Sequence, residues 1–209
     1  MAGTITALKI QKHNKERVNV YLDEAYAFAV TVLVAATLKK GQYLTDPEIE
    51  RFRSQDERHK AYLQAVRFLG FRSRSQQEMV GYLQEKGYAP EIVTDTINRL
   101  LKEHHLDDET FARFWLENRE RFRPRGQQAL RYELWQKGIA NEVIETVLAG
   151  VDEDNLAWAA VERKLSQWQD LSEEDFRKKV LGFLSRRGFT YETVYQVVER
   201  AWAIANQSD

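Results

Sequence analysis

The stretch LQEKG at residues 83–87 returns as LWQKG at residues 134–138 and as LSRRG at residues 184–188. The glycines Gly87, Gly138 and Gly188 lie 51 and 50 residues apart. Self-similarity at such a spacing is typical of stacked supersecondary units. Glycine after a base also marks the end of a helix, because glycine adopts the left-handed conformation and the base faces the negative end of the helix dipole. The stretch therefore predicts three repeats, each with a helix that ends at the glycine.

Apolar residues at helical spacing flank each stretch. One turn before each leucine stands Met79, Leu130 or Val180, on the same helix face. After each glycine an apolar pair follows with a spacing of four, at 93/97, 144/148 and 194/198. A further apolar helical segment precedes each stretch, at 61–68, 111–116 and 156–165. Each unit is thus predicted to contain three helices, and the first connection of the third unit is longer, around 167–171.

Capping signals mark several helix starts. Ser75 and Glu78 have the spacing of a capping box, and Pro90 suits the first position of a helix. Asp107 and Asp108 are placed to cap the helix that follows them. These signals support the division into three helices per repeat.

The first 55 residues follow a different pattern. Apolar residues alternate with polar ones in three runs over 4–10, 17–22 and 25–31, joined by turn-like residues. This alternation predicts a small antiparallel meander. A short helix is expected over 31–38, and Thr45 with Pro47 and Glu48 predicts a helix through Arg53. Because so small a sheet needs a partner, we expect it to pack on its own helices or on the first repeat.

These patterns predict a mainly α protein, with tandem three-helix repeats after a small N-terminal β-meander. We expect the meander and its short helices at 1–55 and the repeats at 56–106, 107–150 and 151–209. The chain has 209 residues, of which 43% are hydrophobic and 30% charged. A chain of this kind is expected to bury two or more small cores.

Composition excludes several classes of protein. The chain has no cysteine, which excludes disulfides and thiolate metal sites and fits a reducing compartment. No apolar run approaches the ~18 residues that a membrane span needs. The first eight residues do not resemble a secretory signal. We therefore expect a cytosolic protein that does not contact a membrane.

Charge is segregated along the chain although the net charge is only −1. Residues 119–131 hold five arginines and one acid, whereas residues 140–162 hold six acids and no base. Such segregation predicts a basic surface beside the start of the second repeat and an acidic one after it.

Three longer motifs resemble the RecX family of recombinase regulators. They are RSxxEMxxxLxxKG at 74–87, LDDExFA at 106–112 and GxxxLxxELxxKG at 126–138. The resemblance covers roughly residues 60–205, about 70% of the chain. ITAL at 5–8 and RVNVYL at 17–22 resemble the β-rich extension of longer family members. The third repeat departs from the pattern with Arg187 in place of lysine, which keeps the charge.

The resemblance implies an elongated, curved array of repeats that binds in the groove of the RecA–DNA filament. Family members are understood to limit filament growth or promote disassembly, which reduces ATP hydrolysis, strand exchange and co-protease activity. It implies a role in recombination, DNA repair and the SOS response. It implies no enzymatic activity, cofactor or metal, and we expect a monomer that contacts RecA, with single-stranded or filament-bound DNA as a further partner.

The arginine-rich turn after residue 118 is the first candidate for a binding surface. Guanidinium groups bind phosphates and carboxylates in a bidentate manner, although a turn of this kind can also be merely solvated. The equivalent turn of the first repeat, and the bases before the glycines, are the other candidates; those bases also suit the helix dipole. The candidate residues are Arg72, Arg74, Lys86, Arg119, Arg121, Arg123, Arg125, Arg131, Lys137, Arg186 and Arg187.

Other residues favour ordinary structural roles. Tryptophans on apolar helix faces predict core packing, while Trp168, between two glutamines, is expected to be exposed. His104 and His105 lack the spacing of a metal site, and no catalytic motif is present. Two alternative functions remain: a stand-alone DNA-binding regulator of the helix-turn-helix type, and a helical scaffold for another protein.

Overall fold

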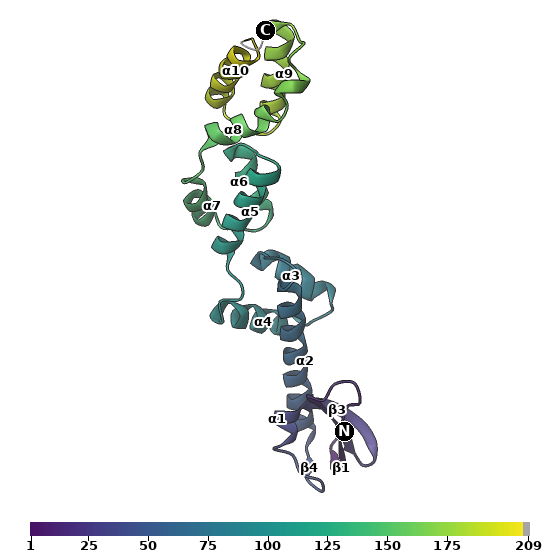
Figure 1. The fold of residues 1–209 in the computed structure, drawn as a ribbon. Coiled ribbons are helices and arrows are strands. Elements are labelled where there is room, and N and C mark those ends of the chain that lie inside the picture. The colour runs from purple at the N-terminus through teal and green to yellow at the C-terminus, as the bar shows by residue number, and fades with distance from the viewer. Residues whose placement is uncertain (207–209) are drawn as a thin grey trace. The chain divides into compact units, whose positions relative to one another are not determined.

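The computed structural model describes residues 1–206, which form ten α-helices, one 3-10 helix and four strands (Figure 1). The mainly helical fold with a small N-terminal sheet confirms the predicted fold class. The chain divides into two compact units. The first compact unit comprises residues 1–71 and 82–105, and the second comprises residues 72–81 and the chain from Leu106 onward.

The N-terminal sheet has the strand order β3-β2-β1-β4, with all strands antiparallel to their neighbours. The strands are β1 (Gly3–Ile10), β2 (Arg17–Leu22), β3 (Ala25–Thr31) and β4 (Tyr43–Leu44). The first three form the predicted meander. Sequence analysis missed β4, because two residues are too few to show an alternating pattern.

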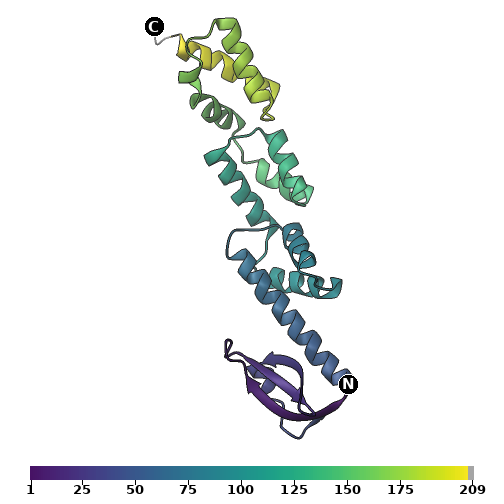
Figure 2. The same cartoon turned by 90° about the vertical axis from the view of Figure 1, so that its right-hand side faces the viewer.

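The sheet packs on the short helix α1 (Val32–Ala35) and on the first turns of the long helix α2 (Asp46–Leu69) (Figure 2). Ile5, Val20 and Leu44 are buried together with Ile49 of α2. The rings of Phe28 and Phe52 stack with their centroids 5.7 Å apart. The expectation that the meander packs on its own helices is therefore confirmed.

Helix α2 begins at the predicted capping box of Thr45 and Glu48. It then continues without a break to Leu69, so the helical segments expected near 46–53 and 61–68 belong to one element. Residues 55 and 56 both lie inside this helix, where we expected the first repeat to begin. The boundaries proposed between the repeats stay a prediction.

Each repeat has one helix on each side of its glycine and a third helix before these two. The helices after α2 are α3 (Gln76–Glu85), α4 (Pro90–Lys102), α5 (Asp108–Phe122), α6 (Gln127–Gln136), α7 (Asn141–Leu148), α8 (Glu153–Glu162), α9 (Glu173–Ser185) and α10 (Tyr191–Ala205). Gly87, Gly138 and Gly188 have φ angles of 83°, 75° and 77°. These left-handed conformations confirm the predicted helix ends.

The predicted apolar helix faces form the cores. In the second compact unit Phe111, Leu130 and Leu134 of the second repeat join Phe176 and Leu184 of the third in one continuous cluster. All five of these side chains are at most 1% exposed.

The prediction that Trp168 is exposed is wrong. The side chain is 7% exposed and lies edge-on to Phe183, with ring centroids 5.3 Å apart. The 3-10 helix at Leu165–Gln167 turns the chain so that Trp168 points into the core while its glutamine neighbours stay outside. The polar neighbours concealed this burial in the sequence.

Candidate partner-binding surface

Consecutive repeats in the second compact unit are joined by a carboxylate that caps a helix of the preceding repeat. Asp108 Oδ1 accepts a hydrogen bond from the backbone N–H of Gln76, at 2.8 Å, where α3 begins. One repeat later, Glu153 Oε1 accepts from the N–H of Gln127 at 2.8 Å, where α6 begins. The two junctions therefore use the same contact, which satisfies a backbone donor that a helix start leaves open.

This contact corrects one predicted cap. Asp107 caps its own helix α5, accepting from the N–H groups of Glu109 and Thr110 as expected. Asp108 instead reaches α3, and burial raises the pKa of its carboxyl. A contact across 32 residues leaves no local signal in the sequence.

The bases before the second and third glycines also close these junctions. Lys137 Nζ lies 2.6 Å from Glu78 Oε1, and Arg187 Nη1 donates to the backbone oxygen of Pro124 at 3.1 Å. The glycines themselves pack closely: a Cβ at Gly138 would lie 2.3 Å from the Gln77 side chain. Lys137 and Arg187 are therefore structural contacts between repeats as well as helix-end bases.

Glu78 neutralises the bases of the first junction. Its carboxylate accepts two hydrogen bonds from Arg72, at 2.9 and 3.1 Å, besides the one from Lys137. Arg74 Nη1 lies 4.0 Å away. Burial opposes ionisation of Glu78, but the hydrogen bonds from Arg72 and Lys137 outweigh it and hold the pKa below its usual value. Three of the candidate bases thus surround one internal carboxylate.

Glu133 has a similar role inside the second repeat. Its Oε2 accepts from Arg119 Nε at 2.7 Å and from Trp115 Nε1 at 2.8 Å. Arg125 Nη1 lies 3.1 Å from Oε1. In addition, Arg131 forms two hydrogen bonds with Glu145, at 2.7 and 2.9 Å. These arginines are held by internal acids, so the dense run of arginines in the sequence overstates the charge offered to a partner.

The second junction lacks the acid of the first. Alignment of the repeats on their glycines places Ala129 where the first repeat has Glu78. Burial, followed by the positive charges of Arg125 and Arg123, lowers the pKa of Arg187. The turn after α5 and the end of α9 therefore bring Arg123, Arg125 and Arg187 together, and we name these three residues the arginine cluster.

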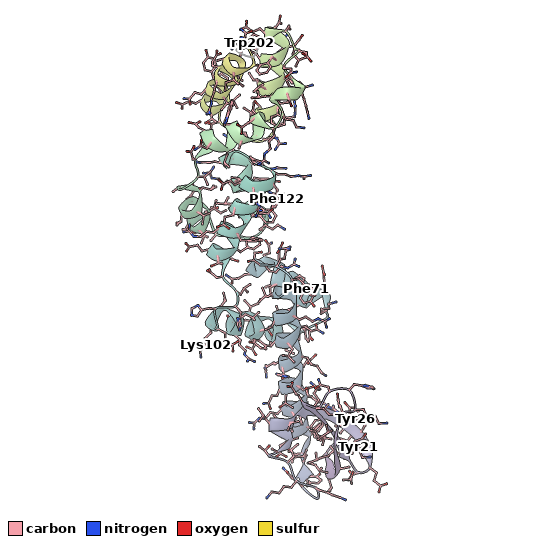
Figure 3. The ribbon with its side chains drawn as sticks, in the orientation of Figure 1. Tyr21, Tyr26, Phe71, Lys102, Phe122 and Trp202 are labelled. Carbon is pink, nitrogen blue, oxygen red and sulfur yellow. The ribbon has the colours of Figure 1, made fainter. Side chains whose placement is uncertain are left out.

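Two exposed arginines lie next to the arginine cluster along the chain. Arg121 is in the last turn of α5, and its guanidinium lies 5.3 Å from the ring of Phe122. Phe122 is labelled in Figure 3. Arg186 precedes Arg187 and is exposed. Within residues 1–206 neither Arg121, Arg123 nor Arg186 forms an ion pair with a carboxylate. Lys86 is also exposed, but it belongs to the first compact unit.

Glu78 and Glu133 are the functional neighbours that sequence reasoning missed. The sequence did contain a signal for both residues. Alignment of the first two repeats on their glycines places Ala129 at the position of Glu78, and Tyr82 at the position of Glu133. The arrangement that remains, several guanidinium groups without a matching acid, can bind phosphates or carboxylates. Among the described residues, no group of histidines and acids is placed to hold a metal ion, and no helix is long and apolar enough to cross a bilayer.

Comparison with known protein families matches most of the chain to the domains of one family. Residues 3–45 match the regulatory protein RecX N-terminal domain. Residues 61–100, 107–148 and 152–198 match the first, second and third three-helix domains of RecX.

Individual proteins agree with these matches. The regulatory protein RecX of Bacillus subtilis (strain 168) is 32% identical over 201 residues, which cover 94% of this chain and 76% of that protein. The same-named protein of Clostridium botulinum (strain Alaska E43 / Type E3) is 28% identical, with 94% and 95% covered. A crystal structure of regulatory protein RecX superposes with a TM-score of 0.76 at 27% identity, covering 95% of this chain and 99% of the other.

Proposed function

This chain belongs to the RecX family, and from that membership we propose that it regulates the RecA recombinase by binding and without chemistry of its own. In this proposal the protein lodges in the groove of the RecA–DNA filament. There it limits filament growth or promotes disassembly, and so reduces ATP hydrolysis, strand exchange and co-protease activity. The partner is the RecA filament, and the protein needs no cofactor.

The observation that carries the proposed contact is the pair of exposed arginines, Arg121 and Arg123, beside the second junction. Arg123 and its neighbour Arg121 are exposed, and neither has an internal acid in the described part of the chain. A protein filament on DNA offers phosphates and carboxylates, both of which guanidinium groups bind well. Arg72, Arg74 and Lys137 surround Glu78, and Arg119 is bound by Glu133, so these bases are not expected to contact the partner.

The proposal is tested by the DNA-dependent ATP hydrolysis of RecA. Adding the purified protein in amounts up to one per RecA subunit should slow ATP turnover and shorten the filaments seen by electron microscopy. Unchanged turnover and filament length in a large excess of the protein would contradict the proposal.

The contact surface is tested by reversing its charge. The double variant Arg121→Glu/Arg123→Glu should inhibit RecA at least tenfold less well, since each lost charge-assisted contact is worth about 1.5–3 kcal/mol. Lys178→Glu/Lys179→Glu is the matched control, because it reverses two exposed bases on α9 of the same unit. Equal inhibition by both double variants would remove the arginine turn from the contact surface and leave the RecA proposal itself to the first experiment.

A further inference from the structure

Two tyrosines lie side by side on the solvent face of the N-terminal sheet (Figure 3). Along β2, Val18, Val20 and Leu22 are buried while the residues between them are not, so Tyr21 belongs to the outer face. Tyr26 pairs with it on β3, and the rings meet edge to face with centroids 6.1 Å apart. Tyr26 is 60% exposed. The outer face therefore offers an aromatic ring to solvent.

Basic side chains surround these rings. Lys9 Nζ lies 4.9 Å from the centroid of the Tyr21 ring. On the other side of Tyr26 opens a groove of about 400 Å³, and its walls carry Arg53 and Lys60 of α2 together with Lys86. All three of these bases are exposed. The groove and both tyrosines belong to the first compact unit.

The acids in this region offset part of its charge, and Lys60 is itself paired with Asp56. Asp56 lies in the groove wall, but it is already paired with Arg17 at 2.7 Å and with Lys60 at 2.8 Å. Glu57 also lines the groove, and Asp23 and Glu24 form the turn between β2 and β3. Residues 1–45 contain six bases and three acids, whereas the whole chain has a net charge of −1. The first 45 residues thus carry an excess of three bases, and Lys9, Arg53 and Lys86 are the bases near the tyrosines that form no ion pair in the described part of the chain.

Lys86 has a distinct position among the three bases that precede the glycines. Its counterparts Lys137 and Arg187 contact the preceding repeat. Lys86 instead faces the groove beside Tyr26, and Gly87 has open space where a side chain would project. The same sequence position that closes the later junctions is available here for a ligand.

We propose that this surface, made of Lys9, Tyr21, Tyr26, Arg53, Lys60 and Lys86, binds single-stranded nucleic acid. An exposed ring beside a basic groove is the arrangement that holds a single strand, because unpaired bases stack on the ring while the groove binds the backbone. A duplex keeps its bases stacked inside and cannot use Tyr26 in this way. The proposal is independent of the RecA surface, which uses other residues on the second compact unit.

The test measures binding of the full chain to a fluorescein-labelled oligothymidylate by fluorescence anisotropy, with no RecA present. The wild type should bind, and Tyr26→Ala should weaken binding about 5- to 150-fold, the range expected for one lost base–aromatic stack. Tyr26→Phe keeps the ring and should bind within about twofold of wild type. Lys86→Glu should weaken binding and lower the slope of log K against log salt by about 0.7 or more.

Two controls keep the test specific. Tyr191→Ala removes a tyrosine that is 79% exposed on α10, and Lys102→Glu reverses an exposed base on α4 of the first compact unit. Both should bind like wild type. Far-ultraviolet circular dichroism of each variant confirms that it folds.

Three results would overturn the proposal. The first is a wild-type chain that does not bind the oligothymidylate at low salt. The second is a folded Tyr26→Ala variant that binds as tightly as wild type. The third is competition by an unlabelled duplex as effective as that by an unlabelled single strand, which would indicate a surface that recognises phosphates alone.

Discussion

Positions 78 and 129 are equivalent in the first and second repeats, but one holds glutamate and the other alanine. Glu78 binds Arg72 and Lys137, so the bases of the first junction are neutralised inside the protein. Ala129 offers no such partner, and the positive charges of Arg123 and Arg125 reach Arg187 instead. A single side chain thus separates a junction whose bases share an internal acid from one at which Arg187 has no acid partner among the described residues.

Replacing Glu78 tests this account at the scale of the residue. Glu78→Ala should lower the free energy of unfolding in urea by about 2–4 kcal/mol, because it leaves three half-buried bases without their acid. The side chain of Glu78 is 17% exposed, which keeps the loss below that of a fully buried pair. Glu117→Ala, at an exposed position of α5, is the control and should change stability by less than about 0.5 kcal/mol.

The pH dependence of this loss has a definite sign. The pKa of Glu78 is held below its ordinary value of 4.5. Its carboxylate therefore stabilises the fold above that value, and the stabilisation disappears as pH falls through the lower, folded-state pKa. The difference between wild type and Glu78→Ala should accordingly shrink in strong acid; a constant difference would contradict the ionic origin.

At the scale of the element, the start of α6 is held by the end of α9. The N–H of Gly126 donates to the backbone oxygen of Arg187 at 3.0 Å. A Cβ at Gly126 would lie 2.1 Å from the carbonyl oxygen of Gly188. Two backbones therefore approach each other where no side chain fits between them.

Gly126→Ala should force this junction apart. We expect a loss of about 2–4 kcal/mol in the free energy of unfolding, since overpacking against backbone cannot be relieved by a rotamer change. Gly150→Ala is the matched control, because nothing lies within 4 Å of its added methyl group. Urea denaturation followed by tryptophan fluorescence measures both, and equal midpoints would refute the close approach.

What the sequence could predict at this scale depends on how local the cause is. Capping residues such as Thr45 and Asp107, and glycines such as Gly138, act on their own helix and were found. The partners of Lys137 and Arg187 lie 59 and 63 residues away, so no spacing rule reveals them. The burial of Trp168 was missed because its glutamine neighbours are exposed while its own contact, Phe183, lies in the next helix.

At the scale of the whole molecule, the two compact units have separate cores, and they differ in their content of tryptophan. The core of the sheet contains Val20 and Phe28, and that of the second and third repeats contains Phe111 and Phe176. All five tryptophans lie in the second compact unit. Tryptophan fluorescence therefore follows that unit alone, whereas circular dichroism follows both.

Denaturation should expose this division. We expect Val20→Ala, which removes two buried methyl groups from the sheet core, to shift the part of the urea curve that circular dichroism records for the first compact unit. The loss should be about 2–3 kcal/mol for that unit. The tryptophan fluorescence curve should stay within error of wild type. Parallel shifts of both curves would mean that the units unfold as one.

Asp108 and Glu153 make the same bond at successive junctions, so the couplings between repeats share one contact although Lys137 and Arg187 have different partners. Excising the middle repeat would bring Glu153 to the start of α3 and Arg187 to Glu78, an acid that suits it. We therefore expect the fold to tolerate loss or duplication of a whole three-helix repeat. The length of the protein can thus change during evolution by whole repeats, without new contacts at the junctions between them.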